Sequence, residues 1–371
     1  PDASSAIYFA VKHCGGNSSA ATQLATSPHF ACIMGYLSSQ LENLQQPRSL
    51  VQLLWALGKL GMQGADVDAV MLHASKVLPR LLPQCCAQEL TNSLWGLSKL
   101  TPVRQRVAEV AFTLANTMIA EASCRIQRLT PQCMSNSLCS ITNLGLKTPE
   151  AEEFARLCAR EVYLGSRDLS TFSTQCLANI LWAWAKLTPF TNKGGVGWGA
   201  HTRLLCQAVM TVSEPRLLEF QPQELSMLAW SLAKLQSRTQ SNQKGRVKHQ
   251  RSKSGAVREA TCFLACLASV AHARLSEFSA QGVSNIAWAL ASSDVLGEEE
   301  VCHFLTAAAL AAAPRLGQFP PQAISNLFWA VGKMSVGNAF GSNSNGKIKH
   351  LAANALAEAA AQQAMHRVSE F

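Results

Sequence analysis

The sequence lacks the motifs by which most catalytic and metal sites are recognised. It contains no G-x-x-x-x-G-K-[ST] phosphate loop, no G-x-G-x-x-G after a strand, no H-E-x-x-H and no G-x-S-x-G. Its 13 cysteines include no C-x-x-C pair, so the usual spacing of a tetrahedral zinc site is also missing. The sequence therefore predicts a protein that is not an enzyme, binds no metal or cofactor and has no small-molecule substrate.

Long apolar runs and tyrosine are scarce as well. No apolar run approaches the roughly 18 residues of a transmembrane helix, so no membrane span is expected. Only 3 tyrosines accompany abundant alanine and leucine, a composition that favours helix. Unpaired cysteines inside apolar runs indicate a reducing compartment. With 371 residues, 48% of them hydrophobic, the chain exceeds a single compact core and predicts several domains or a repeat array.

Acidic residues are outnumbered. The chain has 32 Lys and Arg against 23 Asp and Glu, a net charge of +9. This excess favours an acidic partner, either nucleic acid or an anionic membrane surface. The net charge alone does not show that the chain binds such a partner, because many organellar proteins are basic.

A repeated segment dominates what is present. SLVQLLWALGKL (49–60) recurs as ELTNSLWGLSKL (89–100), CLANILWAWAKL (176–187), ELSMLAWSLAKL (224–235), GVSNIAWALASS (282–293) and AISNLFWAVGKM (323–334), with a weaker copy at 133–144. Each copy has one anchor position, and successive anchors lie between 40 and 58 residues apart. The anchors are Trp55, Trp95, Cys139, Trp182, Trp230, Trp288 and Trp329.

The repeat predicts a helical hairpin. Proline stands eight residues before the anchor at Pro47, Pro131, Pro222 and Pro321, which marks the start of a helix. A second amphipathic stretch follows each anchor helix, and stacked hairpins of this kind bury faces that one unit alone cannot bury. The expected fold is therefore all-α: a right-handed α-solenoid of helical-hairpin repeats of about 40 residues each.

The units divide the chain as one continuous solenoid over residues 1–371. Residues 1–44 form a degenerate N-terminal unit with Phe9 at the anchor position, and residues 45–371 form seven repeat units. Insertions rich in Gly, Ser, Asn and Lys are expected as exposed loops at 189–199, 236–255 and 335–347.

A second stripe recurs on the anchor side of the first helix of each unit, opposite the leucines. Glutamine stands seven before the anchor at Gln88, Gln132, Gln175, Gln223, Gln281 and Gln322. Asparagine stands three before it at Asn92, Asn136, Asn179, Asn285 and Asn326, and lysine four after it at Lys59, Lys99, Lys186, Lys234 and Lys333. Amides can bond base edges, tryptophan can stack a base and lysine can pair with phosphate, so the stripe indicates a single-stranded RNA groove.

A structural role for the same stripe remains open. Small residues flank each tryptophan, for example Ala56 and Gly58, and would let neighbouring helices approach closely around a packed indole. The amides could likewise form a hydrogen-bonded ladder along the stack. Positions that are the same in every unit cannot encode different bases.

Two basic features lie outside the stripe. The 236–255 insertion carries Arg238, Lys244, Arg246, Lys248, Arg251 and Lys253 without an acidic residue. It is either a solvated loop or an arm that orders on phosphate. An arginine closes nearly every second helix (Arg80, Arg125, Arg167, Arg216, Arg274, Arg315 and Arg367), where it would complement the helix dipole or bind phosphate.

These motifs resemble the octotricopeptide repeat family. The pattern P-Q-E-L-x-N-x-x-W-A-L-A-K-L followed by a helix ending in R-L-x-x-F is matched best by 221–235 and 174–187, and the resemblance covers essentially the whole chain. It implies an organellar RNA-binding protein of mitochondria or chloroplasts. The Pro- and Trp-containing opening of the family's second helix is mostly missing here, which favours binding of structured RNA through shape and phosphates.

The resemblance and the stripe together predict a non-catalytic protein that holds ribosomal RNA as a mitochondrial ribosome component or assembly factor, beside other ribosomal proteins. A transcript-specific organellar messenger RNA factor, in the mitochondrion or the chloroplast, is one alternative. A protein–protein scaffold of the HEAT or armadillo kind is the other, and it would show an apolar patch in the groove.

Overall fold

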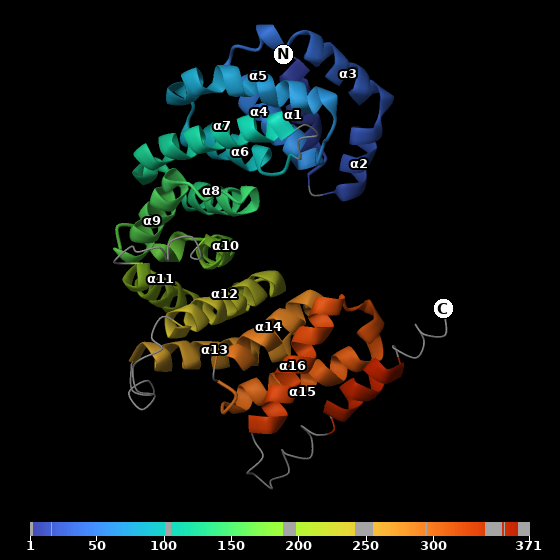
Figure 1. Cartoon of the computed structure of the whole chain (residues 1–371), viewed down its shortest axis with the longest axis vertical. Coiled ribbons are helices and arrows are strands. Elements are labelled where there is room, and N and C mark those ends of the chain that lie inside the picture. Colours follow the sequence, from blue (N-terminus) through green and yellow to red (C-terminus); the bar gives the residue numbers. More distant parts are fainter. Residues whose placement is uncertain are drawn as a thin grey trace. The chain divides into compact units, whose positions relative to one another are not determined.

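The computed structural model describes residues 3–15, 17–100, 105–187, 198–241, 255–293, 295–337, 351 and 353–362. Within these residues the chain is helical and contains no strand, which confirms the predicted class of α-solenoid. Two compact units divide it, the first ending at Arg167 and the second beginning at Asp168 (Figure 1).

Each repeat begins with a helix of one layer, here called the stripe layer. In the first unit these helices are α1 (Ala3–His13), α4 (Pro47–Leu60), α6 (Ala87–Leu97) and α8 (Pro131–Leu144). In the second they are α10 (Thr174–Leu187), α12 (Pro222–Ser241), α14 (Ala280–Ser292) and α16 (Pro321–Gly337). Within each unit every such helix packs against the next one of this layer.

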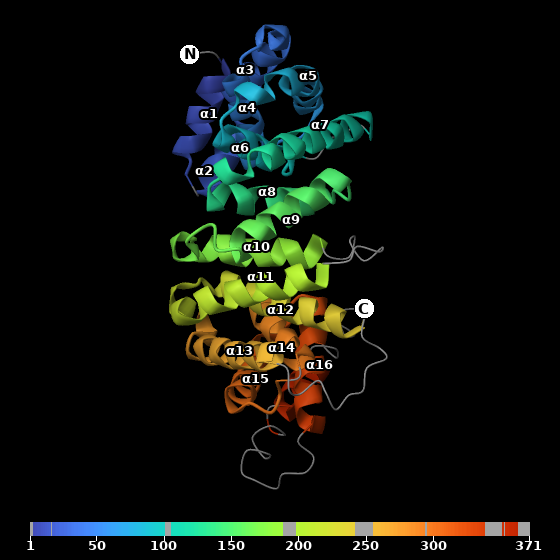
Figure 2. The ribbon, with the colours of Figure 1, turned by 90° about the vertical axis from the view of Figure 1, so that its left-hand side faces the viewer.

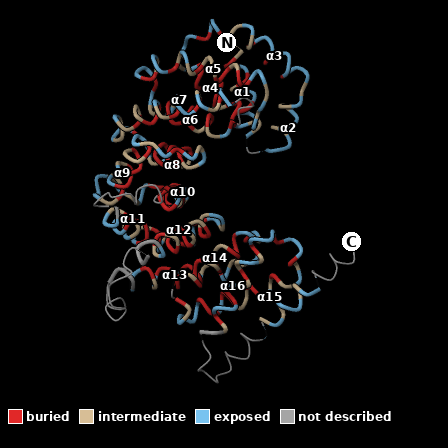
Figure 3. Tube along the Cα trace, in the orientation of Figure 1, coloured by how far each residue is buried: buried red, intermediate tan, exposed pale blue. Residues whose placement is uncertain are grey.

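The second helices form the outer layer. They are α5 (Ala65–Leu81), α7 (Gln105–Cys124) and α9 (Pro149–Tyr163) in the first unit, and α11 (Trp198–Ser213), α13 (Gly255–Ala273) and α15 (Glu299–Ala312) in the second. They too pack in chain order, and Figure 2 shows the succession of layered pairs from the side. Buried residues concentrate where the two layers of a unit face each other (Figure 3).

The N-terminal repeat of the first compact unit departs from the helical-hairpin arrangement of the later repeats. Two helices, α2 (Ser18–Thr26) and α3 (Pro28–Ser39), follow α1, and α3 packs on α5 as the first helix of the outer layer. Sequence patterning missed α2 as a separate element because its residues are mostly Ser, Ala and Thr, with no apolar stripe and no buried side chain.

Helix starts follow the predicted signals. Pro47, Pro131, Pro222 and Pro321 are the first residues of α4, α8, α12 and α16, where the missing N–H costs no helical hydrogen bond. Side-chain caps also occur: Thr130 accepts from the N–H of Cys133 at the start of α8, and Ser279 accepts from that of Gly282 at the start of α14.

Two expected loops begin later than predicted. Helix α12 continues to Ser241 and α16 to Gly337, so residues 236–241 and 335–337 are helical. Polar residues such as Gln236 and Ser237 extend a helix that is already nucleated, since propagation adds a hydrogen bond per residue. The remainder of the three predicted insertions lies outside the described residues, apart from Trp198–Gly199 in the first turn of α11 and Gly255, the first residue of α13.

Adjacent stripe-layer helices approach closely where small residues meet. A Cβ atom built on Gly58 would lie 2.5 Å from the carbonyl oxygen of Gly96, and one built on Gly96 would lie 2.3 Å from that of Leu54. The backbones of α4 and α6 are therefore in contact. This confirms that the small residues beside the tryptophan anchors allow close helix approach.

Candidate RNA-binding stripe

The amides and lysines of the predicted stripe lie at the surface of the stripe layer. The six glutamines (Gln88, Gln132, Gln175, Gln223, Gln281 and Gln322) are exposed, and the five asparagines (Asn92, Asn136, Asn179, Asn285 and Asn326) are half-buried. Lys59, Lys99, Lys186 and Lys333 are exposed, and Lys234 is half-buried. Because neighbouring helices of a unit pack side by side, each unit carries several such rows next to one another.

Lysine ammonium groups lie over the anchor tryptophans. The Nζ atom of Lys99 lies 5.7 Å from the centroid of the Trp95 ring. Lys186 reaches two rings, at 5.9 Å from Trp182 on its own helix and 5.1 Å from Trp230 on the next. These are cation–π distances, so positive charge is held over the half-buried indoles of Trp95, Trp182 and Trp230.

The anchor tryptophans are partly packed between helices and partly exposed at the surface. All the anchors from Trp55 to Trp288 are half-buried, and Trp329 is 45% exposed. By contrast Trp184, two residues after an anchor, is 1% exposed and donates its indole N–H to the Oγ1 of Thr202 at 3.0 Å. The anchors thus combine helix packing with a ring edge or face open to a ligand.

The N-terminal repeat also has an anchor residue, but it lies one residue before the predicted position. Tyr8 is the anchor: its ring lies 5.2 Å from that of Trp55, and Lys12 stands over it at 5.9 Å. Phe9, which the sequence alignment placed there, is exposed on another side of α1. Counting eight residues from Pro1 gave Phe9, whereas the spacing of four residues from Tyr8 to Lys12 matches that from Trp95 to Lys99 and from Trp182 to Lys186.

An amide ladder between helices is absent from the described residues. Their only hydrogen bond between stripe amides joins the Nε2 of Gln281 to the Oδ1 of Asn285 at 2.8 Å, within one helix. The hydrogen-bonded ladder considered as a structural role for the amides is therefore not found among the described residues.

Lys333 differs from the other stripe lysines. Its Nζ donates to the carbonyl oxygen of Ala291 at 2.7 Å, near the C-terminal end of α14, and lies 5.1 Å from the Trp329 ring. The ammonium of Lys333 therefore joins two repeats and is less free for a ligand than that of Lys59.

The arginines that close the second helices hold consecutive repeats together. Arg125 donates to the carbonyl oxygens of Cys85 and Leu82, at 2.6 and 3.1 Å, and pairs with Glu121. Three more make the same contact with the preceding repeat: Arg167 with Leu129, Arg216 with Phe172 and Arg274 with Phe220, at 2.6, 3.0 and 2.7 Å. We call these four side chains the arginine staples.

The staples correct one prediction. These arginines were expected to complement the dipole of their own helix or to bind phosphate, but they bond carbonyls in the turn of the previous repeat, 38 to 54 residues earlier. Their guanidinium groups are occupied and half-buried. Sequence reasoning could not name these partners because the contact joins different repeats.

Other predicted groups give little or nothing here. The side chain of Arg238 and residues Lys244, Arg246, Lys248, Arg251 and Lys253 lie outside the described residues. Among the residues described, no three His, Cys, Asp or Glu side chains are arranged to hold a metal ion. No helix in that part of the chain has the length and apolar character needed to cross a bilayer.

Comparison with models of known protein families finds no match, and comparison with curated proteins finds no similar sequence.

Proposed function

We propose that this chain is a non-catalytic, organellar RNA-binding solenoid of the octotricopeptide repeat kind, which holds ribosomal RNA as a component or assembly factor of the mitochondrial ribosome. The observation that carries the proposal is the stripe itself. Lys99, Lys186 and Lys333 lie over tryptophan rings, and exposed or half-buried amides occupy the same layer of helices. Positive charge, aromatic faces and free hydrogen-bonding groups on one surface are the elements of a single-strand nucleic-acid site.

The geometry favours contact with phosphates over reading of bases. An ammonium over an indole face competes with a base for that face, and it is placed to meet a phosphate instead. Glutamine recurs at the same position in six units and asparagine in five, and identical groups cannot distinguish different bases. RNA shape and backbone charge then supply most of the affinity.

The distribution of exposed apolar side chains argues against a protein–protein scaffold that binds its partner through the stripe. Among the residues that the structure describes, the large exposed apolar side chains are mostly in the outer layer or its turns, such as Tyr36, Phe112 and Leu204, and only Trp329 belongs to the stripe. A protein-binding groove would show the reverse distribution, with an apolar floor and few free cations.

Two variants of equal charge test the proposal. Lys59→Gln, Lys99→Gln and Lys186→Gln neutralise the stripe, whereas Lys76→Gln, Arg106→Gln and Arg203→Gln remove three exposed charges from the outer layer. Affinity for a structured RNA, measured by fluorescence anisotropy across salt concentrations, should fall in the first triple variant only. The slope of log K against log salt should flatten by about 2, since each phosphate contact to a single strand contributes about 0.7.

Equal loss of affinity in both triple variants would refute the stripe as the RNA site. In organelles, ultraviolet crosslinking followed by sequencing separates the remaining alternatives. Crosslinks in ribosomal RNA support the ribosomal role, crosslinks in one messenger support a transcript-specific factor, and no RNA above background leaves a scaffold.

A further inference from the structure

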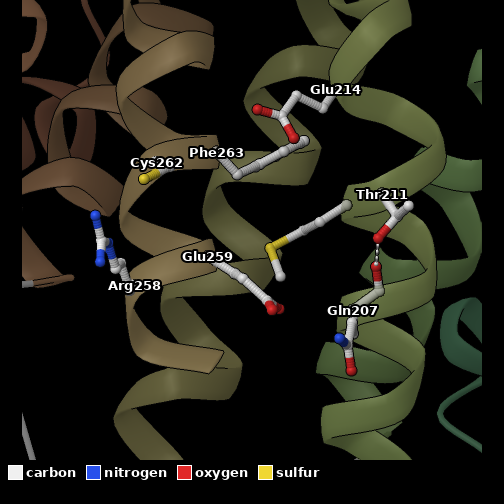
Figure 4. Close-up of a pocket in the computed structure, with 8 residues that line it drawn as sticks. Gln207, Thr211, Glu214, Arg258, Glu259, Cys262 and Phe263 are labelled. Atoms are coloured by element: carbon white, nitrogen blue, oxygen red, sulfur yellow. Dashed lines mark hydrogen bonds between the residues drawn. The ribbon is translucent and has the colours of Figure 1, made fainter. Parts of the chain in front are cut away.

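The outer layer of the second unit holds a cavity of about 360 Å³ between α11 and α13 (Figure 4). Gln207, Met210, Thr211 and Glu214 line it from α11 and the turn that follows, at helical spacings of three and four. Arg258, Glu259, Cys262 and Phe263 line it from α13. The volume falls in the range of small-ligand sites, and the cavity lies on the outer helices, not on the stripe.

Two carboxylates face this cavity from opposite elements. Neither Glu214 nor Glu259 forms an ion pair among the described residues, and Glu214 accepts a weak hydrogen bond from the Sγ of Cys266 at 3.9 Å. Figure 4 shows the Glu259 side chain directed towards α11, while Arg258 lies on the other side of α13. Arg258 also lines the cavity, so the lining carries two carboxylates and one guanidinium, a net negative charge in a chain of net charge +9.

The space between the two carboxylates is apolar. Phe263 and Met210 are buried and line the cavity, Met210 on α11 one helical turn before Glu214 and Phe263 on α13 one turn after Glu259. Figure 4 shows Phe263 between the two glutamates. The Thr211 hydroxyl is already used, since it donates to the carbonyl oxygen of Gln207 at 2.9 Å. The sequence of groups along the cavity is thus carboxylate, thioether and aromatic ring, then carboxylate.

We propose that this cavity binds a linear aliphatic polyamine. Such a ligand has ammonium groups separated by methylenes, which matches two carboxylates separated by an apolar floor. Charge-assisted hydrogen bonds would hold the ammonium ends at Glu214 and Glu259, while the methylenes pack on Met210 and Phe263. An inorganic anion would meet one guanidinium, that of Arg258, against two carboxylates, and a hydrated divalent cation would gain nothing from the apolar floor.

Isothermal titration of the RNA-free chain with spermidine tests the site. Glu259→Gln and Glu214→Gln should each raise Kd by about threefold to tenfold, the range expected for partly exposed charge pairs. Gln207→Lys places a competing ammonium in the cavity from an exposed position and should abolish binding. Glu150→Gln, an exposed glutamate of α9 in the other unit, is the matched control and should leave Kd unchanged.

Competing probes decide the chemistry. Butylamine, with one ammonium, and Mg²⁺, with no methylenes, should bind at least about tenfold more weakly than spermidine, because each satisfies one feature of the cavity. The proposal is overturned if spermidine does not bind the folded wild-type chain, or if Glu150→Gln weakens it as much as Glu259→Gln. It is also overturned if butylamine binds as well as spermidine, which would indicate a pocket for a single cationic side chain.

Discussion

The guanidinium of Arg125 reaches across a repeat boundary to the carbonyl oxygen of Cys85, at 2.6 Å and 40 residues earlier in the chain. A second donation, to Leu82, satisfies another carbonyl of the same 3-10 turn (Leu82–Gln84). The contact repeats at Arg167, Arg216 and Arg274. Charged donors to buried carbonyls are among the stronger hydrogen bonds of proteins.

Removal of a staple should destabilise its unit. We expect Arg125→Ala to lower the free energy of unfolding by about 2 kcal/mol, because two carbonyls lose a charged donor. Arg80 closes the preceding second helix but is exposed and makes no hydrogen bond among the described residues, so Arg80→Ala should change stability by less than about 0.5 kcal/mol. Urea denaturation followed by circular dichroism measures both, and equal effects would contradict the staple role.

Close backbone contact makes two equivalent glycines behave in opposite ways. Gly58 and Gly332 both stand three residues after an anchor tryptophan, yet a Cβ on Gly58 would lie 2.5 Å from Gly96, whereas one on Gly332 meets nothing within 4 Å. Gly58→Ala should therefore cost about 1–3 kcal/mol through forced separation of α4 and α6. Gly332→Ala should stabilise α16 by about 0.5–1 kcal/mol through helix propensity. Thermal melts of the two variants should shift in opposite directions.

Substitutions at Lys333 and Lys59 should distinguish a lysine that stabilises the fold from one that is free to bind RNA. Lys333→Gln removes the donor to Ala291 and is expected to lower stability by about 1 kcal/mol, with a small effect on RNA affinity. Lys59→Gln should leave stability within about 0.5 kcal/mol and weaken RNA binding. Melts and anisotropy on the same two preparations give the comparison. If Lys333→Gln weakens RNA binding as much as Lys59→Gln does, the bond to Ala291 does not restrict its ammonium.

Neighbouring thiols should differ in reactivity. Burial raises the pKa of the Cys85 thiol to about 11 and that of Cys206 to about 12. A raised pKa leaves less thiolate at a given pH, so at pH 8 roughly 0.1% or less of either thiol is ionised. Cys86 is exposed, and peptide mapping after brief iodoacetamide treatment should find Cys86 alkylated and Cys85 and Cys206 protected. Early alkylation of Cys85 in the folded chain would contradict its burial.

The sequence was sufficient for elements governed by local spacing. Proline and the anchor fixed the start and the exposed side of α4, α8, α12 and α16, because a helix places residues three, four and seven apart on one face. Hence the stripe residues were found at the surface as predicted, with their relation to RNA remaining a prediction.

Contacts between repeats could not be predicted in the same way. Periodicity gives the rotation of each helix but not its displacement along the neighbouring helix. The partners of Arg125, the meeting of Gly58 with Gly96 and the reach of Lys186 to Trp230 all depend on that displacement. The cavity between α11 and α13 likewise depends on how two outer helices pack against each other, which residue spacing does not encode.

The arginine staples also make loss of C-terminal repeats different from loss of N-terminal repeats. Each one joins a repeat to the repeat before it, so shortening the protein from its C-terminal end removes a donor together with its own repeat and uncovers carbonyls that water can bond. Shortening from the N-terminal end leaves instead a half-buried guanidinium without its carbonyl acceptors, which is the costlier defect. Versions that lose C-terminal repeats should thus remain folded further than those that lose the same number from the other end.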